Sequence, residues 1–233
     1  MAYDKNLNTV LENATDEELL PIVDYLCKKL SNFIEIDERY KKSPDKPTEY
    51  VDLIADEIRS MGGNSFANLV RGEGVSYHEV VCDVADKLKV PYNKNANVAR
   101  IEECIMQKVF EDAWEKLSPE EREVVVHELS PDVKVSKAIL TMSAQAIFKM
   151  GGFASYKISL IVVNSVSKAL LGRGLALAAN AGLTRSLCIF TGPIGWVLTA
   201  LWALIDIAGP AYKATIPCVL HVAMLRQKQA IGI

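Results

Sequence analysis

Residues 174–210 constrain the fold more than any other part of the chain, because they are almost entirely uncharged. Arg185 and Asp206 are the only charged residues in this stretch, and twenty uncharged positions lie between them. An apolar run of that length is typical of a membrane-spanning segment or of the central helix of a large core. The chain must therefore bury this stretch either in lipid or in protein.

A turn signal divides the stretch into two arms. Gly192, Pro193 and Gly195 break a helix, because glycine tolerates positive φ and proline lacks the amide proton that continues a helix. The second arm, residues 194–208, would extend roughly 22 Å, whereas a bilayer core is about 30 Å thick. We therefore expect a buried apolar hairpin rather than a permanent membrane span, and whether it can insert into lipid stays open.

Small residues at four-residue spacing mark one face of the first arm. Gly174, Ala178 and Gly182 lie on this face, which would let two helix backbones approach closely. We expect the face to pack on another helix, within the fold or in a homo-oligomer. The candidate membrane hairpin consists of these residues and of others at the turn and in the second arm: Gly192, Pro193, Gly195, Trp196, Trp202 and Asp206.

Charge divides the chain into an acidic half and a basic half. The net charge is −3, yet residues 131–233 carry ten basic and two acidic side chains, which leaves −11 for residues 1–130. We expect an acidic all-α domain over residues 1–150, with a short helical subdomain at 1–35, and an apolar basic region over 151–233. The asymmetry indicates two functions or two parts that mask each other. Dispersed basic residues favour anionic lipid over nucleic acid as a partner.

Helix-start signals recur along the chain, and no convincing segment alternates with a period of two residues. Capping-box patterns begin at Thr15, Ser76 and Ser118. The sequence therefore predicts an all-α fold, a helical bundle with a C-terminal apolar helical hairpin. The clearest expected helices cover residues 15–30, 97–117, 131–150 and 158–171, and a last helix is expected to start at Thr215 to Pro217.

Four glycines flank a short polar segment between two predicted helices. Gly62, Gly63, Gly72 and Gly74 favour a tight helix–turn–helix corner, in which glycines adopt positive φ or pack closely. The alternative is a ligand corner that binds phosphate, with ligands drawn from the polar residues between the glycines. Those candidates are Asn64, Ser65, Asn68 and Arg71. The structural interpretation is favoured because no GK[ST] follows and no strand precedes the segment.

Chemical signals elsewhere are weak. The five cysteines lack paired spacing, which favours reduced thiols in a cytosolic protein, and the start of the chain lacks the pattern of a secretory signal. His78 and Cys82 could form one edge of a metal site, but no further ligand is evident, so we expect no metal, cofactor or catalytic residue. Glu102 and Glu103 are interpreted as a solvated helix face. Asp206 either pairs with a nearby cation or reaches water.

Two motifs resemble those of the YaaW family of uncharacterised bacterial proteins. The first comprises residues 53–58, 62–68 and 71–74, and the second comprises residues 192–195, 211–217 and 225–226. The opening segment, Tyr3 to Leu30, resembles the short domain of unknown function with which many members begin. That family has been linked by remote similarity to ubiquinol–cytochrome c chaperones. The resemblance therefore implies an α-helical assembly factor that works beside membrane proteins, and it implies no catalytic residues.

Three functions remain as hypotheses. The main one is a non-enzymatic, membrane-active protein, pore-forming or membrane-perturbing, that shelters the hairpin and releases it into the bilayer. The second is a chaperone or assembly factor that holds a membrane-associated protein on an apolar surface. The third is an enzyme with a site in the glycine-flanked corner. The expected location is the cytoplasm with association to the inner membrane, and the expected partner is membrane lipid or a membrane-associated protein.

Overall fold

Helices are the only regular secondary structure in the described part of the chain. The computed structural model describes residues 3–27, 33–62, 74–129, 152–175 and 210–233, and no strand occurs within these ranges. The all-α class is confirmed. The elements are α1 (Lys5–Glu12), α2 (Asp16–Cys27), α3 (Phe33–Ile36), α4 (Glu38–Lys42), η1 (Pro47–Tyr50), α5 (Val51–Met61), α7 (Tyr77–Lys87), α8 (Val98–Trp114), α9 (Pro119–Leu129), α12 (Gly152–Leu171) and α16 (Pro210–Ala230).

Side-chain caps fix where several helices begin. The Ser76 hydroxyl accepts a hydrogen bond from the Glu79 amide at the start of α7, and the Asn97 side chain accepts one from the Arg100 amide at the start of α8. At α9 the capping box is complete, because Ser118 and Glu121 each accept a hydrogen bond from the other's amide. Each cap satisfies amides that a helix start leaves without intrahelical partners.

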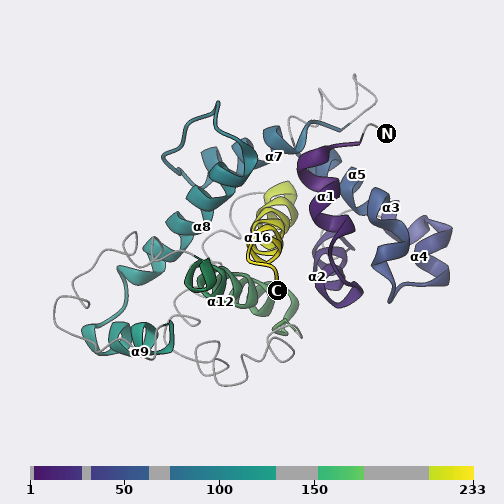
Figure 1. Ribbon diagram of the computed structural model, residues 1–233. Coiled ribbons are helices and arrows are strands. Elements are labelled where there is room, and N and C mark those ends of the chain that lie inside the picture. Colours follow the sequence, from purple (N-terminus) through teal and green to yellow (C-terminus); the bar gives the residue numbers. More distant parts are fainter. Residues whose placement is uncertain (1–2, 28–32, 63–73, 130–151, 176–209) are drawn as a thin grey trace.

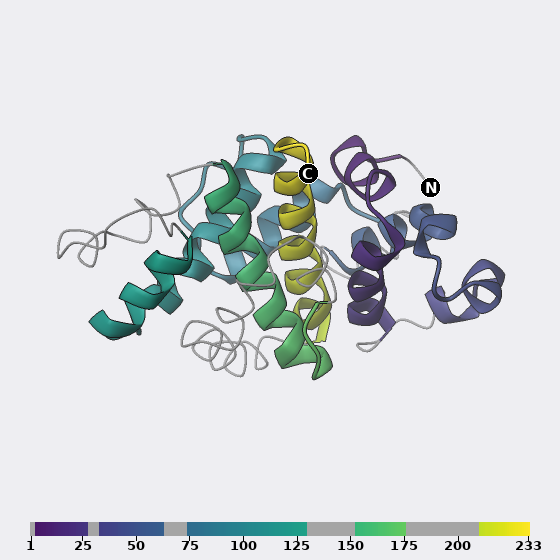
Figure 2. The same ribbon diagram turned by 60° about the horizontal axis from the view of Figure 1, so that its bottom comes forward.

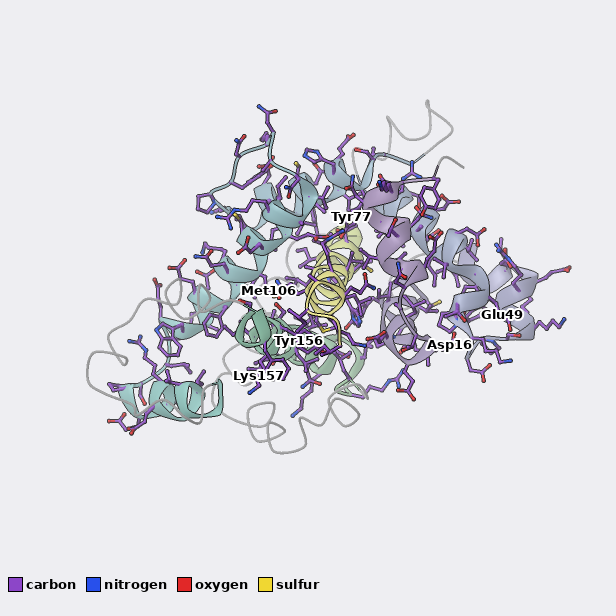
Figure 3. The ribbon with its side chains drawn as sticks, viewed as in Figure 1. Asp16, Glu49, Tyr77, Met106, Tyr156 and Lys157 are labelled. Carbon is purple, nitrogen blue, oxygen red and sulfur yellow. The ribbon has the colours of Figure 1, made fainter. Side chains whose placement is uncertain are left out.

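Helix α16 lies at the centre of the molecule. Figure 1 shows it between α12 on one side and the pair α1–α2 on the other, with α7 and α8 along a further side. Every residue from Ala214 to Leu225 is buried, so all faces of the helix are covered. Figure 3 shows Tyr77, Met106 and Tyr156 near α16, and all three are buried.

Helices from both halves of the chain share one hydrophobic core. Buried side chains of α1, α2, α5, α7 and α8 belong to the same cluster as those of α12 and α16. Figure 2 shows α12 and α16 side by side along much of their lengths. The division of the chain at residue 150 into two domains stays a prediction.

The expected start of the last helix is wrong. Helix α16 begins at Pro210, and Pro217 lies inside it. Proline removes one intrahelical hydrogen bond and costs roughly 3 kcal/mol in a helix interior. Burial of Pro217 together with its neighbours on every face offsets that cost. Local signals alone favoured a fresh start at Thr215, and tertiary packing outweighs them.

The two described ends of the glycine-flanked corner, residues 62 and 74, are closely packed. Gly62 has a φ of −80°, and a Cβ there would lie 2.4 Å from the Cγ2 of Val80. A Cβ on Gly74 would lie 2.9 Å from the carbonyl carbon of Arg59. The buried Arg59 side chain also donates hydrogen bonds to the carbonyls of Val75 at 2.8 Å and Gly74 at 3.3 Å. Close packing, rather than positive φ, therefore requires glycine at both positions.

Replacing Gly62 with alanine is expected to destabilise the protein by about 1–3 kcal/mol, because the new methyl group would overlap Val80. Urea denaturation of the Gly62→Ala protein measures this cost. The matched background is Val80→Ala, in which the overlapping methyl group is absent. The cost of Gly62→Ala should shrink there, and an equal cost in both backgrounds would show that Val80 is not the source of the strain.

Candidate functional site

The last two turns of α16 carry four consecutive polar residues, Arg226 to Gln229, which we call the C-terminal polar cluster. Successive residues of a helix point about 100° apart, so four of them face nearly all directions around the axis. Each makes a hydrogen bond to another part of the fold. Besides the contacts of Arg226, the bonds join Gln227 to Ser159 of α12 at 2.7 Å, Lys228 to Glu18 of α2 at 2.6 Å, and Gln229 to the Val10 carbonyl of α1 at 2.8 Å.

Arg226 pairs with a buried carboxylate, that of Glu102. Its Nε lies 2.6 Å from Oε2 of Glu102, and its Nη2 lies 3.2 Å from Oε1 of the same carboxylate. The Tyr77 hydroxyl donates a further hydrogen bond to Glu102 at 2.9 Å, and Arg226 also donates to the Asn6 carbonyl at 2.5 Å. Four separate parts of the chain, from α1, α7, α8 and α16, thus meet at one ion pair.

Burial dominates the electrostatics of the Glu102 carboxylate. It raises the pKa of Glu102 above its ordinary value, and the hydrogen bonds from Arg226 and Tyr77 oppose that rise. Burial also raises the pKa of Tyr77, so its hydroxyl stays protonated and donates. With donors on both oxygens, the carboxylate is a structural acceptor rather than a free general base. The interpretation of Glu102 as part of a solvated face is wrong, whereas Glu103 is partly exposed and pairs with Arg100.

A cavity of about 310 Å³ adjoins the C-terminal polar cluster. Its polar lining residues are Glu102, Glu103, Ser155, Arg226 and Gln227, and its other lining residues are small or apolar: Ala99, Gly152, Ala223, Ala230 and Ile231. Two exposed apolar residues follow lining residues closely in the chain, Phe153 after Gly152 and Ile233 after Ile231. The cavity can therefore accept an apolar side chain of another molecule, with a charged group at one wall.

A second polar pair lies where α2 meets α16. The rings of Tyr25 and His221 make an edge-to-face contact with centroids 6.0 Å apart, and both residues are buried. The Tyr25 hydroxyl and both ring nitrogens of His221 have no partner within normal hydrogen-bond geometry, although the Ser167 side chain lies near the hydroxyl and the Glu18 backbone lies near the imidazole. Burial lowers the pKa of His221 to about 4, and the nearby Glu18 opposes this shift. The imidazole is therefore neutral near pH 7, and three buried polar atoms are unsatisfied at this contact.

The described residues offer little for catalysis. The Cys82 thiol lies 3.7 Å from Nδ1 of His78, whose Nε2 lies 3.2 Å from the Ala96 carbonyl. Burial raises the pKa of Cys82, which opposes formation of the reactive thiolate. Within the described ranges, no three side chains of His, Cys, Asp or Glu are placed to hold a metal ion.

Most residues of the predicted sites lie outside the described ranges. Of the hairpin, only Gly174 is described, and a Cβ there would lie 2.7 Å from Oδ1 of Asn164, which accepts a hydrogen bond from the Leu175 amide. Ala178, Gly182, Gly192, Pro193, Gly195, Trp196, Trp202 and Asp206 fall outside the described part, as do Gly63, Asn64, Ser65, Asn68, Arg71 and Gly72 of the corner.

Sequence reasoning missed the ion pair of Glu102 and Arg226. One signal was present, because Glu102 falls on the same helical face as Met106, Val109 and Ala113, at spacings of four, three and four residues. An acidic residue in such an apolar row indicates a buried, partnered carboxylate. Its partner lies 124 residues away in the chain, and no local pattern identifies it.

Two comparisons with known proteins found relatives of this chain. Residues 48–221 match the sequence model of a family described as ubiquinol-cytochrome C chaperone. A UPF0174 protein of Helicobacter pylori strain J99 is 42% identical over 97% of this chain and 92% of its own length, and another from that strain is 37% identical over 81% and 93%. The UPF0174 protein YaaW of Escherichia coli strain K12 is 27% identical over 93% and 92%. No solved structure matches significantly.

Breaking the buried ion pair should be costly. The Arg226→Met variant leaves the Glu102 carboxylate buried without its cation, and we expect a loss of about 3–5 kcal/mol in the free energy of unfolding. The double variant Glu102→Met with Arg226→Met removes both charges and should lose less than Arg226→Met alone. Urea denaturation measures both. A double variant less stable than either single one would contradict this account of the pair.

Acid should unfold the protein partly through His221. Its pKa is lower in the folded chain than in the unfolded chain, so the folded state binds fewer protons between pH 6.5 and pH 4. Stability is therefore full above pH 6.5 and falls by about 3 kcal/mol as the pH drops to 4. The control is His221→Leu, which lacks this proton site. Denaturation curves that fall equally with pH in both proteins would rule out the assignment.

Proposed function

The chain belongs to the ubiquinol-cytochrome C chaperone family and to the UPF0174 proteins, and from this membership we propose that it is a non-catalytic chaperone or assembly factor for membrane-associated proteins. The observation that carries the proposal is the family match over residues 48–221, which includes α5, α7, α8, α12 and much of α16. The substrate of such a protein is another polypeptide, held while it folds or assembles.

The cavity beside the C-terminal polar cluster is the proposed anchor point for that partner. Its small and apolar lining residues suit an inserted apolar side chain, and desolvated pockets of this kind concentrate binding energy in protein interfaces. Phe153, which follows the lining residue Gly152 in the chain, is 46% exposed, and Ile233, two residues after the lining residue Ile231, is 55% exposed. This arrangement supports binding of an apolar segment by the folded chain.

The comparisons favour the chaperone over the membrane-active protein. They give no support to pore formation, which the hairpin and the charge asymmetry had suggested. Within the ranges that the structure describes, no helix is long and apolar enough to cross a bilayer. We propose that the partner is a membrane-associated protein rather than lipid itself, and that the chain works in the cytoplasm near the inner membrane. Self-association through residues 174–182 belongs to the same proposal.

Site-specific photo-crosslinking tests this function in cells. A photoreactive amino acid at Phe153 should give adducts with a small set of membrane-associated proteins, identified by mass spectrometry. The matched control is the same amino acid at Ile36, which is 59% exposed but lies on α3, away from the cavity lining. Deleting the gene should lower the assembled amount of the captured proteins.

Two results would contradict the chaperone. One is an adduct pattern at Phe153 no different from that at Ile36. The other is dye release from anionic liposomes by the purified folded protein, which would support membrane perturbation instead.

A further inference from the structure

Helices α1 and α2 cover a face of the central helix, and we call them the N-terminal helix pair. Both contact α16, and their buried residues join the main core. They lie before residue 48, where the family match begins, whereas α5, α7, α8 and α12, which cover the other faces, lie within it. The helices that cover this face of α16 thus lie outside the residues that match the family model, although a UPF0174 relative matches 97% of the chain.

The rim of this contact is polar and complementary in charge. Lys228 pairs with Glu18 at one place, and Arg173 pairs with Asp24 at another. Glu18 and Asp24 are six residues apart on α2, which is about 9 Å along a helix. The side of the contact that is formed by α16 and by the residues just after α12 therefore favours an apolar helix that carries two carboxylates at this spacing.

The interior of the contact is imperfect. Tyr25 and His221 face each other there, and their three buried polar atoms have no hydrogen-bond partners. Unsatisfied buried groups destabilise a contact, so the N-terminal helix pair covers this face less favourably than a helix with a matching donor or acceptor would. A competing helix of that kind has an advantage at this position.

We propose that the face of α16 beneath the N-terminal helix pair is a docking surface for a partner protein, and that α2 occupies it in the free chain. The occupant is an amphipathic helix of the partner, with an apolar face, two carboxylates about two turns apart, and a polar side chain that reaches His221. This inference rests on the proposed function and names the surface on which it acts.

Charge reversal at the rim weakens the cover without placing a charge in the core. Asp24→Arg sets two cations against each other at a partly exposed position, where the Asp24 side chain is 35% exposed and that of Arg173 is 69% exposed. Lys228→Glu would place a second carboxylate beside the buried Glu18, and the repulsion between them could prevent folding. Asp24→Arg is therefore the first variant. Adding Arg173→Asp swaps the pair and should restore the cover. The matched control is Asp86→Arg on α7, which breaks the exposed ion pair between Asp86 and Lys94 of the following loop.

Amide hydrogen exchange of the full-length proteins reports the cover directly. Asp24→Arg should speed exchange in α1 and α2 by about threefold and in residues 216–225 of α16 as well. The swapped pair and the Asp86→Arg control should match the parent protein. Unchanged exchange in Asp24→Arg, or equal changes in the control, would overturn the proposed cover.

A synthetic peptide of α2 serves as a model for the partner helix. It carries residues 15–27 with Cys27→Ser, and a control peptide carries lysine in place of Glu18 and Asp24. The acidic peptide should bind full-length Asp24→Arg at least threefold more tightly than the parent protein, and the lysine peptide should bind neither. Failure of the acidic peptide to bind Asp24→Arg, despite faster exchange in α16, would overturn the docking surface.

The outcome is separable from that of the proposed function. Suppose that photo-crosslinking at Phe153 captures partners, but the peptide does not bind and hydrogen exchange is unchanged. The chaperone function is then supported, and the docking surface lies elsewhere. If the peptide binds and no partner is captured in cells, the surface stands and the proposed function fails.

Discussion

The fold depends on the burial of one helix on all its faces. With every residue from Ala214 to Leu225 buried, α16 can be stable only inside a shell of other helices. Helices α1, α2, α5, α7, α8 and α12 provide that shell, and the apolar contact among them supplies most of the stabilisation. The polar residues that follow the buried stretch fix the helix in rotation and position, because each bonds to a different part of the fold.

Two polar residues of the central helix differ in their hydrogen bonding. Arg226 pairs with Glu102 and donates to the Asn6 carbonyl, so the end of α16 is joined to α8 and α1. His221, about one and a half turns earlier, has no partner for either ring nitrogen. A satisfied buried network specifies one arrangement, whereas an unsatisfied one lowers the stability of its contact. The contact between α2 and α16 is therefore firm at its rim and weak at its centre.

Much of the fold could be predicted from the sequence, and much less of the site. Capping residues such as Ser76 and Ser118 predicted helix starts correctly because a cap is a local interaction. The burial of Glu102 and the continuation of α16 through Pro217 could not be predicted this way, since both depend on partners far away in the chain. Arg59 was missed for the same reason, because its acceptors, the carbonyls of residues 74 and 75, lie beyond the corner and become neighbours only after folding.

A folded chain that holds a membrane-associated protein through the surfaces around α16 accounts for the family match, the cavity and the incomplete contact at His221. Lysine-specific crosslinking with mass spectrometry, performed in cells on the full-length chain, tests this most directly. The account predicts crosslinks from Lys157 and Lys228, near the cavity and the rim of the α2 contact, to membrane-associated proteins. Crosslinks to other proteins only from Lys41, Lys42 and Lys94, on α4 and in the loop after α7, would contradict it.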